Sequence, residues 1–174
     1  MWLTNFLGGS DMELKEKIVK TAKVCHVISK VLYLLSIAVT LAFIVLAIVL
    51  PNTDAIESME RAEVAVMFST LALYAFICIG LLWNVEGIFK VIASEHSPFT
   101  EGVSHYLKKV AVFVLVLSIV PAILGTIIVR SVCPATELNF PVEVGGIVAG
   151  LVLFLIGWFS KYGIELQKKD DETL

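Results

Sequence analysis

The sequence is poor in charge, and its longest apolar stretches carry none at all. Charged residues make up 17% of the 174 residues and hydrophobic residues 58%, above the roughly 45–50% apolar content of soluble proteins. Asp, Glu, Lys, Arg and His are all missing from four blocks, residues 31–50, 64–83, 110–129 and 144–159. A soluble amphipathic helix alternates apolar and polar stripes with a period of about 3.6 residues, whereas these blocks are apolar on every side. The pattern excludes a soluble helical bundle.

Cysteine is scarce as well, which excludes a disulfide framework. Of the three cysteines, Cys25 is expected on the inner side, Cys78 inside the second apolar block and Cys133 outside, so no external pair exists. Cys133 alone would face an oxidising exterior, where it could cross-link two copies. An unpaired small residue near the membrane surface is the preferred interpretation.

Signatures of catalysis and of metal binding are also missing. The chain has no GxxxxGK phosphate loop, no GxSxG and no HExxH. The nearest ionisable candidates lie between the second and third blocks without metal-ligand spacing: Glu86, Glu95, His96 and His105. Ionisable residues inside a bilayer are costly and are kept mainly for function, and the blocks have none. We therefore predict a protein that is not an enzyme and needs no cofactor or metal. A lipid-modifying enzyme acting through Glu86 or His105 is the last-ranked alternative.

The lengths of the blocks match those of membrane-spanning helices. About 20 residues cross the ~30 Å hydrocarbon layer, and each of the first three blocks contains twenty. The fourth reaches this length if it begins near Pro141 and if Lys161 extends toward the interface. We predict an all-α, integral membrane four-helix bundle with spans at about 31–50, 64–83, 110–129 and 142–162. It forms a single domain over residues 12–174, preceded by an apolar extension over residues 1–11 that lies on the membrane surface.

The distribution of basic residues predicts the orientation of these spans. All but two of the thirteen Lys and Arg residues fall on the side that holds both termini, and basic residues favour the cytoplasmic side. On the other side Arg61 and Arg130 are outnumbered by Asp54, Glu57, Glu60, Glu63, Glu137 and Glu143. Both termini are therefore expected in the cytoplasm. The alternative function is an immunity-type protein whose acidic external surface meets a cationic peptide, or an accessory protein whose bundle forms part of a larger transporter.

The connection between the second and third spans and the tail after the fourth hold the most distinctive sequence. Ser97 or Thr100 is expected to cap the helix of the third span, and Phe99 to pack inward at the turn. The tail ends in acidic residues but intersperses the apolar residues Ile164, Leu166 and Leu174. Apolar contact points among charges are suited to docking a cytosolic partner or the inner loop. A solvated tail is the alternative.

Proline and glycine within the third and fourth spans predict how the helices pack. Pro121 removes one backbone hydrogen bond and is expected to kink the third span, with Gly125 one turn later admitting a close neighbour. In the fourth span Gly146 and Gly150 form a GxxxG face for close helix packing. Packing within the chain and homodimerisation both fit this face.

Two parts of the chain resemble an uncharacterised prokaryotic family of four-span membrane proteins, catalogued as domain of unknown function 2975. The ending that resembles it is Phe159-Ser160-Lys161-Tyr162-Gly163-Ile164-Glu165-Leu166-Gln167, followed by Asp170-Asp171-Glu172-Thr173-Leu174. The part similar to its inner loop is Ile88-Phe89-Lys90, then Ser97-Pro98-Phe99-Thr100 and Leu107-Lys108-Lys109. The resemblance covers the chain from about Met12 onward by layout. It implies four helices in a prokaryotic plasma membrane and no assigned enzyme activity. Members are often encoded beside a small helix-turn-helix DNA-binding regulator.

These features and the resemblance together predict a non-enzymatic membrane protein that binds or modulates a cytosolic helix-turn-helix regulator through its inner face. It would contact the lipid bilayer but no nucleic acid, and a homodimer is a further expectation. The residues expected to bind the partner are Pro98, Phe99, Tyr162, Gly163, Leu166, Gln167, Asp170, Asp171 and Glu172. The residues expected to pack helices together are Pro121, Gly125, Gly146 and Gly150.

Overall fold

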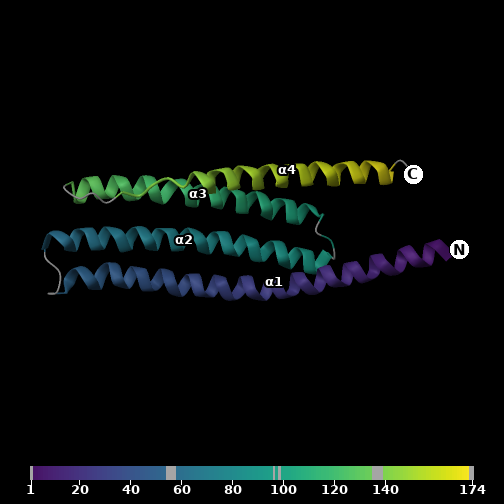
Figure 1. Cartoon of the computed structure of the whole chain (residues 1–174), viewed down its shortest axis with the longest axis horizontal. Coiled ribbons are helices and arrows are strands. Elements are labelled where there is room, and N and C mark those ends of the chain that lie inside the picture. The colour runs from purple at the N-terminus through teal and green to yellow at the C-terminus, as the bar shows by residue number, and fades with distance from the viewer. Residues whose placement is uncertain (1, 54–57, 96, 98, 135–138, 173–174) are drawn as a thin grey trace.

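The chain folds into four long helices and one short 3-10 helix (Figure 1). The computed structural model describes the backbone of residues 2–53, 58–95, 97, 99–134 and 139–172, and the side chains of those from 16 to 165 except 58–60. The helices are α1 (Trp2–Val49), η1 (Leu50–Asn52), α2 (Ser58–Glu95), α3 (Glu101–Val132) and α4 (Val144–Glu172). All four α-helices are long and apolar enough to cross a membrane. The predicted all-α bundle of four helices with the length of membrane spans is confirmed.

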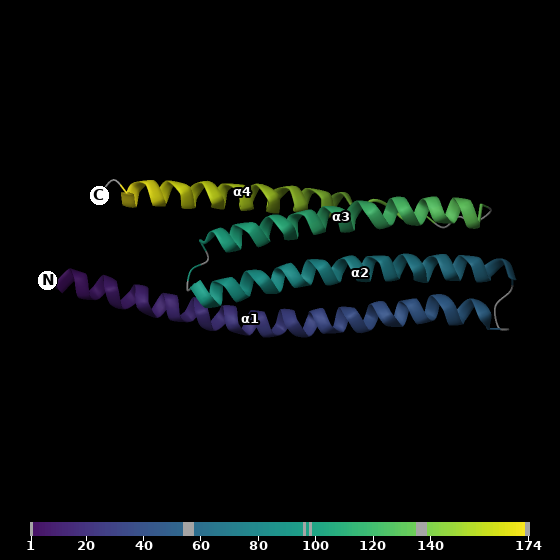
Figure 2. The same ribbon diagram turned by 180° about the vertical axis from the view of Figure 1, so that it is seen from behind.

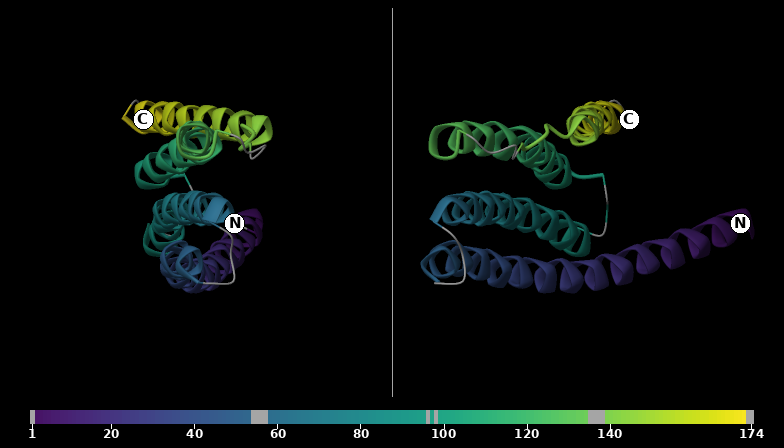
Figure 3. Two further views of the ribbon diagram at one scale, coloured as in Figure 1. Left: turned by 90° about the vertical axis from the view of Figure 1, so that its left-hand side faces the viewer. Right: turned by 60° about the vertical axis from the view of Figure 1, so that its left-hand side comes forward.

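The four α-helices lie antiparallel in a single row, in chain order (Figures 1 and 2). Within the described residues α1 packs on α2, α2 on α3 and α3 on α4, and no other pair of α-helices makes contact. Figure 3 shows α1 at one edge of the row and α4 at the other. Both termini lie at the end that holds the α2–α3 turn. We call it the lysine-rich end, because it carries Lys17, Lys20, Lys90, Lys108 and Lys161.

Small side chains fill the contacts between helices, while large apolar ones cover the outside of the row. On α3 the buried residues include Ser104, Ala111, Ser118 and Gly125, spaced by seven along one side. Large side chains such as Leu41, which is 59% exposed, face outward. Helices in lipid associate through close packing of small residues, since acyl chains solvate the large apolar ones. The distribution is that of helices surrounded by hydrocarbon.

The apolar blocks of α1, α2 and α3 lie side by side at the same level. The ring of Phe43 in α1 lies 6.2 Å, centroid to centroid, from that of Phe68 in α2. Between α2 and α3, a Cβ on Gly80 would overlap the ring of Phe113. In both pairs the two residues lie at similar distances from the lysine-rich ends of their blocks. One hydrocarbon layer therefore fits all three blocks.

The fourth helix begins half-way along α3 rather than at its far end. Ser118 lies near the middle of the apolar block of α3, and its carbonyl accepts a 3.4 Å hydrogen bond from the backbone N–H of Glu143, the residue before α4. Further along, Gly146 packs on Ser118, and Gly157 packs on Lys108. The apolar residues of α4 are therefore displaced toward the lysine-rich end relative to those of α3.

Glu143, predicted for the acidic outer surface, lies beside the middle of the apolar block of α3 rather than at its end. The non-helical segment 139–143 runs back along the outer half of α3, where Phe140 packs beside Gly125. Glu143 reaches the level of the centre of the α3 block. The sequence analysis assumed that every charged residue outside the four apolar blocks lies outside the bilayer. This assumption does not hold for a segment that runs back along a helix. An acidic residue at this level is a candidate functional group.

The first helix extends past the α2–α3 turn at the lysine-rich end (Figure 1). It contains 48 residues, which corresponds to about 72 Å. Residues 2–11 are its first turns. Residues of the apolar extension predicted for the membrane surface thus belong to the same helix as the first span.

At the opposite end Cys133 is a free thiol, 9% exposed. Its backbone N–H donates a 2.7 Å hydrogen bond to the carbonyl of Val129 and ends α3. This burial disfavours the interpretation in which Cys133 cross-links two copies.

Candidate functional site at the lysine-rich end

Two side-chain hydrogen bonds shape the turn between α2 and α3. Thr100 Oγ1 accepts a 3.3 Å bond from the N–H of Val103 and is the N-cap of α3. Ser97 Oγ accepts a 3.2 Å bond from the N–H of Phe99. Phe99 lies between the two and is 68% exposed. The prediction that Phe99 packs inward is wrong, because its ring is largely exposed.

Phe99 instead meets the lysine-rich end of α4. Together with Phe159, Ser160, Gly163 and Ile164 it lines a groove of about 260 Å³. Ile164 is 8% exposed, whereas the space around position 163 is open. Two residues predicted for the partner surface, Phe99 and Gly163, are thus brought together from distant parts of the sequence. We call this the Phe99–α4 groove.

The other residues predicted for this surface lie along α4 or outside the described structure. Tyr162, next to the groove residues along α4, is 60% exposed. Because α4 continues to Glu172, the predicted tail is the end of this helix. Side chains outside the described residues are those of Leu166, Gln167, Asp170, Asp171 and Glu172, and Pro98 is also outside. In the acidic outer surface the same holds for Asp54, Glu57, Glu60 and Glu137.

The residues predicted to pack helices lie at contacts within the chain. Pro121 is fully buried in α3, which continues through it as an α-helix. A Cβ on Gly125 would lie 3.0 Å from the Thr70 methyl of α2. At Gly146 and Gly150 it would overlap side chains of α3. The GxxxG face is therefore occupied by α3, and a homodimer would need another surface.

One polar contact between helices was missed in the sequence. Nδ1 of His26 in α1 lies 3.8 Å from Oε1 of Glu86 in α2, and the two side chains are 29% and 18% exposed. His26 lies on the same face of α1 as the buried residues Val19, Ala22 and Ser29. This helical spacing is the signal from which the contact could have been predicted. Nδ1 is buried without a hydrogen-bond partner among the described residues. The pair is an ion pair when His26 is protonated.

The described residues hold no group of three or more His, Cys, Asp or Glu side chains that could bind a metal ion. Comparison with protein-family models, curated proteins and solved structures found no match. The resemblance to a prokaryotic family therefore stays a prediction. The Phe99–α4 groove is a candidate site on the basis of its geometry, because the exposed ring of Phe99 lines a largely apolar groove. Such an arrangement suits protein binding.

Proposed function

We propose that this chain is a non-enzymatic membrane protein that binds a cytosolic protein at its lysine-rich end. The observation that carries the proposal is the Phe99–α4 groove. Phe99 precedes α3, which begins at Glu101, whereas the apolar block begins at Val110. Nine helical residues separate these two positions, a rise of about 14 Å. Measured along α3, the exposed ring therefore lies outside this apolar block, and acyl chains around the block do not account for its exposure.

An exposed ring beside an open groove is suited to anchor a partner. Aromatic side chains that become buried in a pocket supply much of the binding energy of protein interfaces. Here Gly163 leaves space beside Ile164, and Tyr162 exposes a second ring on the same helix. A partner seated in the groove would cover apolar surface that water otherwise contacts.

The orientation and the class of partner rest on the sequence. The excess of lysine favours a cytoplasmic location for this end. The resemblance to a family encoded beside helix-turn-helix regulators points to such a regulator, held at the plasma membrane of a prokaryotic cell. A signal would release it by shifting the protein between two arrangements of its helices. Pro121 is the candidate hinge, because α3 links the groove to the opposite end.

Phe99→Ala is expected to lower capture of the cytosolic partner at least tenfold, because loss of an interface anchor typically costs about 2 kcal/mol or more. Capture is measured by quantitative mass spectrometry of proteins that co-purify with the tagged full chain from native membranes in mild detergent. The control is Phe76→Ala, since Phe76 is 64% exposed but lies within the apolar block of α2. Unchanged capture by Phe99→Ala would contradict the proposal. Recovery of transporter subunits alone would favour the accessory-protein function.

Reversing the charges of Asp170, Asp171 and Glu172 to lysine is expected to weaken the same capture severalfold. These residues end the helix that lines the groove, and complementary charges at the edge of an interface assist association. Capture is compared with that by Glu13→Lys/Glu16→Lys, which changes charge on the projecting part of α1. If the triple reversal leaves capture intact, the partner surface ends at the groove.

A further inference from the structure

A second cavity at the lysine-rich end lies between α3 and α4 and is lined mainly by residues with polar side chains. It has a volume of about 450 Å³ and is lined by Glu101, Gly102, Ser104, His105, Lys108 and Lys161. It shares no lining residue with the Phe99–α4 groove. Small-molecule sites typically have volumes of roughly 300–1,000 Å³. The cavity is therefore large enough for a polar headgroup.

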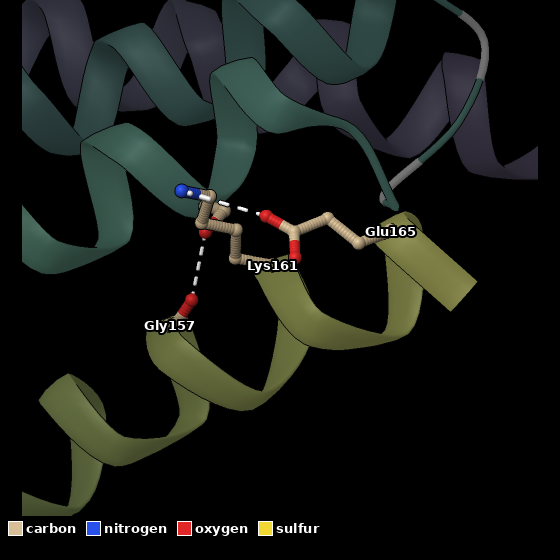
Figure 4. A network of polar contacts seen from close by, with 4 residues as sticks. Gly157, Lys161 and Glu165 are labelled. Carbon is tan, nitrogen blue, oxygen red and sulfur yellow. Dashed lines mark hydrogen bonds and ion pairs between the residues drawn. The ribbon is translucent and has the colours of Figure 1, made fainter. Parts of the chain in front are cut away.

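A close contact between the helices forms one side of this cavity. Ser104 Oγ donates a 2.7 Å hydrogen bond to the carbonyl of Gly157 (Figure 4). Cγ of Lys108 lies only 3.0 Å from the position of a Cβ on Gly157. Because glycine has no side chain, the stem of Lys108 packs directly on α4. The packing fixes the stem of Lys108 at the wall of the cavity.

Two lysines, Lys108 and Lys161, line the cavity together with His105, and Glu101 is the acidic residue of its lining. Lys161 Nζ lies 3.5 Å from Oε1 of Glu165, one turn further along α4 (Figure 4). Their side chains are 55% and 53% exposed, and an exposed pair of this kind is weak. An anion that contacts Lys108 and Lys161 together can therefore compete with Glu165 for Lys161.

The cavity lies at the boundary of the apolar blocks. Lys108 is two residues before Val110, where the block of α3 begins, and Lys161 is two residues after the end of the α4 block. The rings of Trp158 and Tyr162 are 59% and 60% exposed. Exposed Trp and Tyr side chains concentrate at the headgroup level of membranes. Basic pockets between spanning helices at this level bind anionic lipid headgroups.

We propose that the cavity binds the phosphate headgroup of an anionic phospholipid. Lys108 and Lys161 contact the phosphate, and His105 lines the same cavity. The acyl chains run along the exposed apolar surface of α4. A soluble phosphate has the same charge, but the location beside the apolar blocks favours the lipid. The inference does not depend on the proposed cytosolic partner.

The test measures lipid binding to the full chain in phosphatidylcholine nanodiscs that contain increasing phosphatidylglycerol, by native mass spectrometry. We expect Lys108→Gln/Lys161→Gln to bind phosphatidylglycerol roughly thirtyfold more weakly than the wild type does. This factor combines two losses of about fivefold, each corresponding to the usual attraction of one lysine for anionic lipid. The control Lys30→Gln/Lys90→Gln removes the same charge from exposed positions of the same end. It is expected to weaken phosphatidylglycerol binding by a smaller factor than Lys108→Gln/Lys161→Gln does, because exposed lysines contribute only diffuse attraction.

Equal weakening in the two double variants would show diffuse attraction and overturn the proposal. Saturable binding of inorganic phosphate in pure phosphatidylcholine nanodiscs, as tight as that of the lipid, would assign the site to a soluble anion instead. Because Lys108 packs between helices, Lys161→Gln alone is tested as a second variant. We expect roughly fivefold weaker binding for it, and unchanged binding would also overturn the proposal.

Discussion

Gly150→Leu is expected to lower the thermal unfolding temperature of the protein and to detach α4 from α3. A Cβ at position 150 would lie 2.7 Å from Cγ of Leu115 and 3.2 Å from the backbone oxygen of Ala111. The Leu115 side chain can rotate, but the Ala111 carbonyl is held in its helix. Overpacking of this kind costs about 1–3 kcal/mol. Among the α-helices, the described part of α4 contacts α3 alone, so no other helix compensates.

The matched control for this substitution is Gly145→Leu on the same helix. A Cβ there has nothing within 4 Å, and replacing glycine in an exposed helix position gains up to about 1 kcal/mol. Its unfolding temperature in detergent, followed by circular dichroism, should be equal to that of the wild type or higher. An equal loss in both variants would attribute the effect to the glycines themselves rather than to the contact with α3.

A thiol introduced by Glu143→Cys is expected to react with a membrane-impermeant maleimide at least tenfold more slowly than one introduced by Pro134→Cys. Both are made in a chain carrying Cys25→Ser, Cys78→Ala and Cys133→Ser. Pro134 is exposed just past the end of α3, whereas residue 143 is hydrogen-bonded to Ser118 at the middle of the α3 block. Apolar surroundings at that depth exclude the charged reagent.

Labelling rates are measured in proteoliposomes, with denaturation in detergent as the control that both thiols are reactive. Equal labelling rates in the bilayer would show that residue 143 lies at the aqueous surface, as predicted from the sequence. A slow rate would indicate that the Glu143 carboxylate lies inside the apolar layer. Acidic residues in such positions commonly belong to ion or proton pathways.

The number of helices followed from composition, because blocks of twenty residues without charge have few alternatives to spanning a bilayer. The return of residues 139–143 along α3 could not be predicted from composition. It depends on the packing of Phe140 beside Gly125, which is a contact between separate segments. Phe99 was misjudged because apolar residues are usually buried, whereas the ring of Phe99 is exposed at the turn between α2 and α3. The polar cavity was missed because it arises from the alignment of α3 with α4, which neither helix encodes alone.

A row in which the described part of each α-helix contacts only the α-helices next to it in the sequence can be assembled in the order of synthesis. The first two helices can pair before the third leaves the ribosome, and the fourth has to find only the third. Chains fold from their N-terminal parts during synthesis, and contacts between sequence neighbours form fastest. A closed ring would require the last helix to meet the first. Here each helix after the first can pack on its predecessor as soon as it has been made.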